Sequence, residues 1–268
     1  MIPENKTSPL LTIVTVVFNG EAFIENTILS VINQNYRNME YVVIDGGSTD
    51  CTLNIIKKYA HRIDCLVSEK DNGIYDAMNK GVQRASGEWI NFLNAGDSIS
   101  FDPDCLSKYD SNVTLFVYGN AIVKDGRGGT LYISGKEIQQ SDLLNSMPVC
   151  HQAIFYSRKF ILPYDLRYKI IADRVMTYSL MNSEFKSRYD VNIRVEYLEG
   201  GMSYQNNSIK FREEIMFLKD LDRDTLRLRF VRYLTVYVKS TLYNIIRSNL
   251  YSSALYSAIK KVLLRYWL

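Results

Sequence analysis

Short apolar runs alternate with segments of helical spacing over the first hundred residues, and this alternation restricts the chain to few folds. The continuous apolar run at 10–18 is typical of a strand buried on both faces. Further strands are predicted at 41–44, 63–67 and 88–93, and helices at 21–34, after Ser48-Thr49-Asp50, and at 75–85. This strand–helix series predicts an α/β fold with a parallel sheet and right-handed crossovers.

The alternation weakens after residue 100. Strands are predicted at 115–118 and 131–134 on either side of a glycine-rich turn, and again at 152–156 and 194–197. Helices are expected over 173–181 and 208–222. There is no internal repeat, so the second half is expected to complete the same body rather than to duplicate the first.

Charge is unevenly distributed along the chain, although the net charge is only +3. No acidic residue follows Asp224, whereas eight basic residues do; the preceding part carries 24 basic and 29 acidic side chains, a net of −5. Drawn as a helix, the tail has a basic stripe, an apolar face and a tyrosine border. This predicts an interfacial anchor on an anionic membrane surface. The alternative is a helical hairpin packed on the body or on a second subunit, as in a homodimer.

The sequence also bears on other partners and on the compartment of the protein. Charges interrupt every apolar run of the tail, which disfavours a transmembrane span. Nucleic-acid binding is not expected, because no recognised motif accompanies the basic residues. The amino terminus shows no secretory signal, and the four dispersed cysteines fit reduced thiols, so a cytoplasmic protein is predicted.

Polar clusters follow three of the predicted strands. They are Phe18-Asn19-Gly20, Asp45-Gly46-Gly47 and Asn94-Ala95-Gly96-Asp97. Ligands of open parallel sheets bind beyond the carboxyl ends of the strands. Asp45 can accept hydrogen bonds from a base or ribose, or act as a turn carboxylate. Asp97 can ligate a hard cation or form an Asx turn. Neither a Gly-x-Gly-x-x-Gly fingerprint nor a phosphate loop is present, which argues against a dehydrogenase and an NTPase.

Four segments in this order resemble the inverting family 2 glycosyltransferases of the GT-A fold. They are 12–20 (TIVTVVFNG), 41–50 (YVVIDGGSTD), 71–81 (DNGIYDAMNKG) and 86–97 (SGEWINFLNAGD). The similarity is closest to bacterial enzymes that build O-antigen, capsule or colanic-acid-type polysaccharides. It implies a mostly parallel sheet flanked by helices over 1–205, with a nucleotide-binding half at about 10–100 and an acceptor half at about 101–205. Residues 206–268 would form a helical basic extension.

The resemblance implies transfer of a hexosyl or N-acetylhexosaminyl group from a nucleotide-diphosphate sugar. We expect the donor to be a UDP-sugar. The acceptor would be a lipid-linked glycan or polysaccharide on the inner face of the bacterial plasma membrane. A non-catalytic nucleotide-sugar-binding or scaffold subunit is the alternative, because parts of the family's acidic motifs are missing. A nucleotidyltransferase is a third possibility, although Phe18-Asn19-Gly20-Glu21 is not the glycine-rich basic loop such enzymes carry.

Donor and metal sites are carried over from the family motifs. Phe18 would pack on the base, Asn19 would shape the turn and Asp45 would read the base. The full donor set is Phe18, Asn19, Asp45, Gly46, Asp71, Gly73, Asn79, Lys80, Ala95 and Asp97. Asn79 and Lys80 also suit a solvated helix face. Of the family's metal motif only the carboxylate of Asp97 is present, so Mg²⁺ or Mn²⁺ would take its other ligands from the diphosphate and water.

The acceptor half supplies the remaining candidates. An inverting transfer needs a general base for the acceptor hydroxyl, and the resemblance assigns this role to Asp173, with Ala172 in place of the family's first acidic residue. Asp165 is the nearest rival, although Pro163-Tyr164-Asp165 is typical of a turn. His151 and Gln152 resemble a pair near the acceptor or diphosphate, and 200–203 resembles a loop that closes on the donor.

Overall fold

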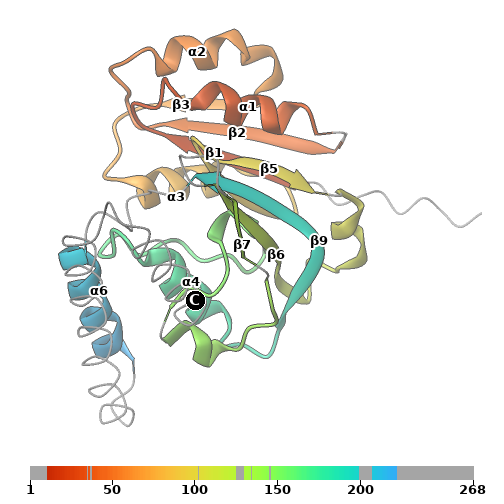
Figure 1. The fold of residues 1–268 in the computed structure, drawn as a ribbon, viewed down its shortest axis with the longest axis vertical. Helices are drawn as coiled ribbons and strands as arrows, with labels where there is room; N and C mark the ends of the chain where they lie inside the picture. The colour runs from red at the N-terminus through yellow and green to blue at the C-terminus, as the bar shows by residue number, and fades with distance from the viewer. Residues whose placement is uncertain are drawn as a thin grey trace, which may run out of the picture.

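The computed structural model describes residues 11–34, 36, 38–101, 103–124, 130–133, 135–144, 146–198 and 207–221. The predictions for 200–203 and for the basic tail lie outside the described residues. In the described part of the chain, the strands form one nine-stranded sheet in the order β3-β2-β1-β4-β8-β6-β9-β5, with β7 paired to β6. Helices flank this sheet (Figure 1), so the predicted α/β fold is confirmed.

The elements have the following bounds. The strands are β1 Leu11–Val17, β2 Met39–Asp45, β3 Cys65–Ser68, β4 Trp89–Asn94, β5 Ser98–Phe101, β6 Thr114–Lys124, β7 Thr130–Ile133, β8 Ile154–Ser157 and β9 Lys186–Leu198. The α-helices are α1 Ile24–Ile32, α2 Thr52–Lys58, α3 Ile74–Arg84, α4 Ala172–Leu180 and α6 Asn207–Asp220. Short 3₁₀ turns are η1 Ala60–Arg62, η2 Pro103–Lys108, η3 Gln140–Leu144 and η4 His151–Ala153.

Strands β1 to β4 form a parallel unit, as the alternation predicts. Their last residues are in register: Val17 lies opposite Asp45, Asp45 opposite Ser68, and Val16 opposite Asn94. Strands β6 and β9 run in the same direction as this unit, whereas β5, β7 and β8 run against it. The polar clusters that end β1, β2 and β4 therefore meet at one edge of the sheet.

Helices cover both faces of the sheet (Figure 1). Helices α1 and α2 pack on one core, which contains Ile13, Val43 and Leu93. Helices α3, α4 and α6 pack on the other, which contains Val14, Ile44 and Phe92. The packing of α3 is close: a β-carbon at Gly81 would lie 2.3 Å from Cγ1 of Val14, so only glycine fits there.

The second half differs from the prediction in three places. Strand β5 was not predicted, because it has only four residues and alternates serine with apolar residues. Strand β9 begins at Lys186 rather than at 194. The prediction missed its first half because charged residues alternate there and no apolar run marks a strand. The strand predicted at 152–156 begins only at Ile154, and His151–Ala153 form a 3₁₀ turn instead.

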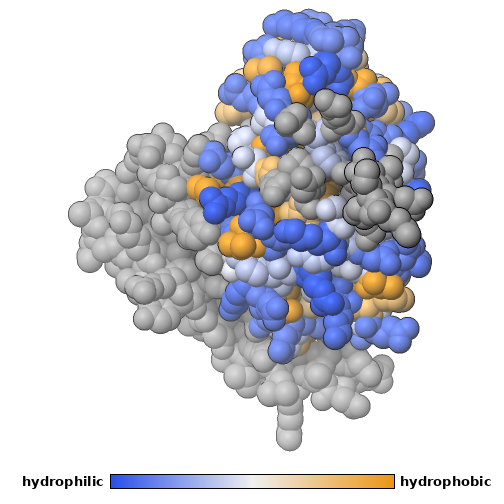
Figure 2. Space-filling view, turned by 90° about the vertical axis from the view of Figure 1, so that its right-hand side faces the viewer, coloured by the Kyte–Doolittle hydropathy of each residue, from blue (hydrophilic) through white to orange (hydrophobic). Residues whose placement is uncertain are grey.

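No helix in the described part of the chain is both long and apolar enough to cross a membrane. On the face drawn in Figure 2, hydrophilic residues predominate among the coloured ones, and hydrophobic residues occur in small separate groups. Among the described residues, the large apolar side chain with the highest exposed fraction is Phe18, at 61%.

Candidate active site

Two loops at the carboxyl edge of the sheet hold each other in place. Asn19 has a left-handed backbone (φ 49°), which asparagine tolerates better than most residues. Its N–H donates to Oγ of Ser48 at 2.8 Å, and its Oδ1 accepts from the N–H of Thr49 at 2.8 Å. Asn19 thus ties the turn after β1 to the loop after β2, and its part in a donor site stays a prediction. The neighbouring exposed ring of Phe18 is therefore presented on a fixed turn.

Asp45 is fully buried at the end of β2. Both of its carboxylate oxygens accept from the N–H of Ser48, at 3.1 and 3.3 Å, and Oδ2 accepts from the hydroxyl of Ser68 at 2.6 Å. These are the contacts of a turn carboxylate that joins two loops. Its reading of a nucleotide base stays a prediction.

Asp71 lies against the backbone of the β2–α2 loop. A β-carbon at Gly46 would come within 2.3 Å of its Oδ2, so glycine leaves the space that the carboxylate fills. Its Oδ1 accepts from the N–H of Gly73 at 2.8 Å, and Gly73 has a φ of 116° that favours glycine. The structure thus brings three predicted donor residues together at one loop junction.

Asn79 and Lys80 are engaged in contacts within the protein. The Asn79 amide forms two hydrogen bonds with the backbone of Tyr164. Nδ2 of Asn79 donates to the carbonyl O of Tyr164 at 2.9 Å, and the N–H of Tyr164 donates to Oδ1 of Asn79 at 2.8 Å. Lys80 Nζ lies 2.8 Å from Glu69 and donates to the O of Lys70. These contacts dock α3 on two neighbouring segments, and donor contacts of Asn79 and Lys80 stay untested.

Asp97 follows β4 and is nearly buried. Its Oδ2 accepts from Nε2 of Gln152 at 2.9 Å, and its backbone O accepts from the hydroxyl of Thr27 at 2.8 Å. Gly96 before it has a φ of 101°, and the N–H of Ala95 donates to the O of Val16. The structure therefore joins the β4 loop to the His151–Gln152 segment, a contact that the sequence did not predict.

The residues around Asp97 could supply only part of the ligand shell of a divalent cation. Among the described residues, no group of three His, Cys, Asp or Glu side chains is placed to hold a metal ion. Carboxylate oxygen is a suitable ligand for Mg²⁺ or Mn²⁺. Asp97 can supply one such ligand, and the amide of Gln152 fixes its orientation.

Asp173 lies in the first turn of α4 and is half-buried. Its Oδ1 accepts from the hydroxyl of Tyr75 at 3.0 Å, and the same hydroxyl lies 2.8 Å from the O of Ile170. Burial, and then the negative charge of Asp173, raise the pKa of Tyr75 well above its ordinary value. Tyr75 therefore stays a proton donor, and it fixes one oxygen of the carboxylate.

His151 is buried in an aromatic cluster beside this carboxylate. Its Nε2 lies 2.7 Å from the hydroxyl of Tyr164, and its ring stacks on Phe92 with centroids 5.4 Å apart. Burial lowers its pKa, although the charge of Asp173 opposes the effect. Tyr164 in turn packs against Tyr75 at 5.2 Å. The neutral ring therefore supports the wall of the site behind Asp173.

The thiol of Cys150 is influenced by the charges of both Asp97 and Asp173. Burial raises the pKa of Cys150 to about 12, and the charges of Asp97 and Asp173 add to the effect. Both carboxylates therefore act on the same side chain, although 76 positions separate them in the sequence. Direct contacts make the same link: Gln152 bonds Asp97, the adjacent His151 bonds Tyr164, and Tyr164 packs on Tyr75, which bonds Asp173. A short chain of neighbouring side chains therefore joins the predicted cation ligand to the predicted base.

Sequence reasoning missed three residues of this arrangement. Tyr75 stands inside the 71–81 motif, where its place at the start of an expected helix was the available signal. Tyr164 and Glu213 gave none, because Tyr164 bonds Asn79, 85 positions earlier, and Glu213 of α6 accepts from the N–H of Ile170, 43 positions earlier. Asp165, the rival for the base, instead forms an ion pair with Arg167 at 2.6 Å.

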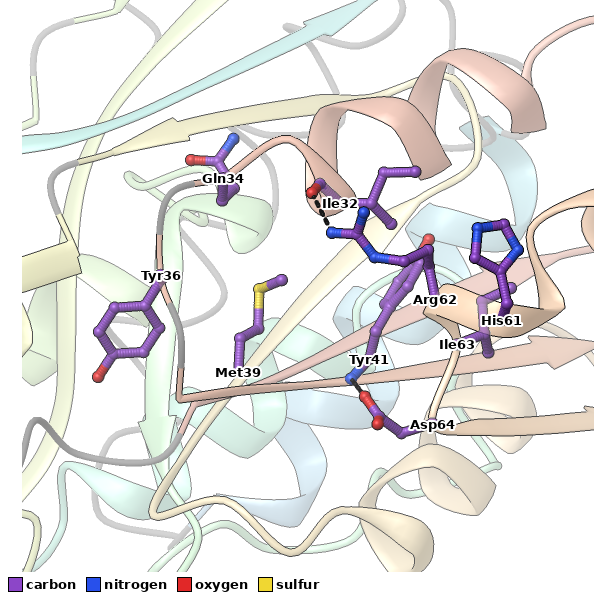
Figure 3. A pocket seen from close by; sticks show the side chains of 9 residues that line it. All are labelled: Ile32, Gln34, Tyr36, Met39, Tyr41, His61, Arg62, Ile63 and Asp64. Carbon is purple, nitrogen blue, oxygen red and sulfur yellow. Dashed lines mark hydrogen bonds between the residues drawn. The ribbon is translucent and has the colours of Figure 1, made fainter.

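A concave pocket of about 380 Å³ lies elsewhere, at the starts of β2 and β3 (Figure 3). Its lining residues are Ile32, Gln34, Tyr36, Met39, Tyr41, His61, Arg62, Ile63 and Asp64. Two of its polar groups bond within the protein, Arg62 to the O of Ile32 and Asp64 to the N–H of Tyr41. None of the predicted site residues lines it, so the candidate active site is the opposite edge.

Comparisons with known proteins find similar sequences among glycosyltransferases. The family model described as "Glycosyl transferase family 2" matches residues 12–188. A "PGL/p-HBAD biosynthesis glycosyltransferase" of Mycobacterium bovis is 34% identical over 233 residues, which are 81% of this chain and 86% of the relative. An uncharacterised glycosyltransferase of Haemophilus influenzae is 29% identical over 134 residues, covering 49% and 52%.

Solved structures share the fold at low sequence identity. S. aureus TarS 1-349 in complex with UDP has a TM-score of 0.60 at 19% identity, covering 89% of this chain and 73% of that one. The mannosyltransferase PcManGT from Pyrobaculum calidifontis, in complex with GDP-Man and Mn²⁺, has a TM-score of 0.60 at 14% identity, covering 97% and 81%. These likenesses confirm the predicted α/β architecture.

Proposed function

The chain belongs to glycosyl transferase family 2, and on that premise we propose that it is an inverting transferase that uses a UDP-sugar. The observation that carries the proposal is the chain of contacts between Asp97 and Asp173. Gln152 bonds Asp97, the adjacent His151 bonds Tyr164, and Tyr164 packs on Tyr75, which bonds Asp173. The carboxylate of Asp97 follows strand β4, next to the donor loops. The carboxylate of Asp173 is oriented by Tyr75. An inverting transfer requires a cation or donor ligand and a base in such an arrangement.

The proposed step uses Asp173 as the base. The acceptor oxygen attacks the anomeric carbon, and its proton passes to Asp173. The bond between that carbon and the phosphate oxygen breaks, and the nucleoside diphosphate leaves with the electron pair. Because Tyr75 donates to Oδ1, the other oxygen of Asp173 is the one proposed to take the proton.

Asp97 is the proposed protein ligand of a divalent cation. When bound, the cation would offset the charge on the leaving diphosphate. The chain's own part is to hold the Asp97 carboxylate in place through Gln152. Solved relatives of the same fold are described with Mn²⁺, GalNAc-T7 and PcManGT among them, which supports this assignment.

We expect Asp97→Asn to raise the metal concentration needed for half-maximal turnover by about 10-fold or more, because a neutral amide is a weaker ligand for a hard cation. Turnover is measured against Mn²⁺ and Mg²⁺ concentration, with EDTA as the metal-free reference. Gln152→Ala is the graded comparison: it keeps the carboxylate and removes the amide that orients it, so it should raise the metal requirement less than Asp97→Asn does. Full activity of the wild type in EDTA would contradict the role of the cation.

The experiment that tests the function compares nucleotide sugars as donors. UDP-glucose, UDP-galactose, UDP-GlcNAc and GDP-mannose are each incubated with lipid extracted from bacterial membranes, and binding and nucleotide release are measured. The expected result is transfer from a UDP-sugar with inverted anomeric configuration, established by NMR of the product. TarS in complex with UDP-GlcNAc supports the choice of a UDP donor. Donor binding without turnover for every sugar would favour the non-catalytic scaffold instead.

We also propose a lipid-linked acceptor in bacterial surface polysaccharide synthesis and a peripheral position on the inner face of the plasma membrane. The support is the +8 charge that follows Asp224, with Trp267 and several tyrosines among its basic residues. The full chain should sediment with vesicles that contain phosphatidylglycerol and much less with phosphatidylcholine alone. Replacing Lys260, Lys261 and Arg265 by glutamine should reduce this binding. Equal sedimentation of both proteins would favour the packed hairpin or a homodimer.

A further inference from the structure

Helix α4, which carries the proposed base, begins without a cap of its own. The residue before its first turn is Ile171, whose side chain offers no acceptor, and no side chain of α4 caps it. The N–H groups at the start of a helix have no partners within that helix and need acceptors from elsewhere. The segment that enters α4 therefore takes its geometry from another part of the chain.

That part is α6. The carboxylate of Glu213 accepts from three successive backbone N–H groups, those of Lys169, Ile170 and Ile171, at 2.9 and 3.1 Å for the last two. Glu213 is only 5% exposed. Three amides that converge on one carboxylate form an anion-binding nest, in which the buried charge is stabilised. Figure 1 shows α6 beside α4.

The same segment is held from its other side by helix α3, which carries Tyr75. The single hydroxyl proton of Tyr75 is shared between the carbonyl of Ile170, at 2.8 Å, and Oδ1 of Asp173, at 3.0 Å. Glu213 thus fixes the N–H side of Ile170, and Tyr75 fixes its carbonyl side. A shift of the Ile170 peptide would move the hydroxyl that orients the Asp173 carboxylate.

We propose that Glu213 is a positioning residue for the glycosyl transfer, acting through the entry of α4 on the carboxylate of Asp173. The inference rests on the proposed function of that carboxylate. Helix α6 lies beyond residues 12–188, which the family model matches, so this support comes from the chain's own extension. Helix α6 then supports the candidate active site from outside the region that the family model matches.

The test uses the full chain with Glu213→Gln. Glutamine has the same shape, but its NH₂ group cannot accept from a backbone N–H. We expect kcat for release of UDP, with the best UDP-sugar of the donor panel and extracted lipid, to fall about 10- to 100-fold, because small displacements of a catalytic group have effects of this size. The donor KM should stay within about twofold, since the donor loops are not touched.

Asp220→Asn is the matched control on the same helix. Asp220 bonds Tyr168 and Arg167, so its loss loosens the docking of α6 without touching the amides before α4. It should retain kcat. A second readout is Glu213→Gln in the Asp173→Asn background. If Glu213 acts through Asp173, the double variant should be no slower than Asp173→Asn alone.

Three results would overturn the proposal: wild-type kcat in Glu213→Gln, an equal loss in Asp220→Asn, or a further loss of similar size on top of Asp173→Asn. If Glu213→Gln does not fold, Glu213→Asp replaces it, because the shorter carboxylate cannot reach all three amides, and wild-type kcat in that variant overturns the proposal. Hydrogen exchange at residues 169–171 tests the nest without substrate. Asp173→Asn that retains full turnover would refute the proposed base itself, whatever the exchange shows.

Discussion

Asp173→Asn should reduce glycosyl transfer by about 10²- to 10⁴-fold, the contribution typical of a positioned general base. The amide keeps the size of the side chain and can still accept from Tyr75, so the fold and the aromatic wall should persist. What it loses is the ability to take the proton of the acceptor hydroxyl. The measurement is kcat with the best donor of the panel, together with the binding constant for UDP.

The loss should appear in kcat, and the binding constant for UDP should change little. The donor loops follow β1 and β2, whereas Asp173 lies on α4. Asp165→Asn is the matched control: it also neutralises an aspartate in the acceptor half, but this aspartate is bound to Arg167. It should retain turnover. Unchanged kcat in Asp173→Asn, or an equal loss in Asp165→Asn, would remove Asp173 from the mechanism.

The nucleotide-binding half could be predicted from the sequence because its signals are local. A continuous apolar run indicates a strand buried on both faces, and polar residues directly after it must lie at the carboxyl edge. Asn19 and Asp97 lie in loops that follow predicted strands, and Asp45 is the last residue of β2, so all three are at the carboxyl edge. Their proximity follows from the register of parallel neighbours.

The support of the candidate base could not be predicted in the same way. Glu213 is one of several charged residues in a helix whose sequence is typical of a solvated surface. Its burial depends on amides 42 to 44 positions earlier, which no periodicity reveals. Strand β5 shows the same limit, since its partner β9 lies almost a hundred residues later. Long-range polar contacts leave no pattern in a single sequence.

The neighbour of Glu213 on α6 has a different role, and it leads to the largest expected effect on stability. Glu214 forms a buried ion pair with Arg174, the residue after the proposed base, and the guanidinium also lies 5.2 Å from the ring centre of Phe217. Arg174 is only 2% exposed, and among the described residues its Nε has no hydrogen-bond partner. The carboxylate of Glu214 is therefore the main compensation for a buried positive charge.

Glu214→Ala should lower the free energy of unfolding by about 3–5 kcal/mol, because it leaves the Arg174 charge buried without its partner. Urea unfolding followed by circular dichroism measures this loss. The double variant Arg174→Met/Glu214→Leu should recover most of it, since well-packed apolar side chains often replace a buried ion pair without loss. A loss below about 1 kcal/mol, the size expected of an exposed pair, would contradict the assignment.

Adjacent glutamates on one helix are thus expected to separate two functions of α6. Loss of the Glu213 carboxylate should appear mainly in kcat, because its partners are the amides that lead to Asp173. Loss of the Glu214 carboxylate should appear first in stability, because its partner is a buried cation. If both variants instead lowered stability and turnover in the same proportion, α6 would act only as a packing element, and the specific link from Glu213 to the base would fail.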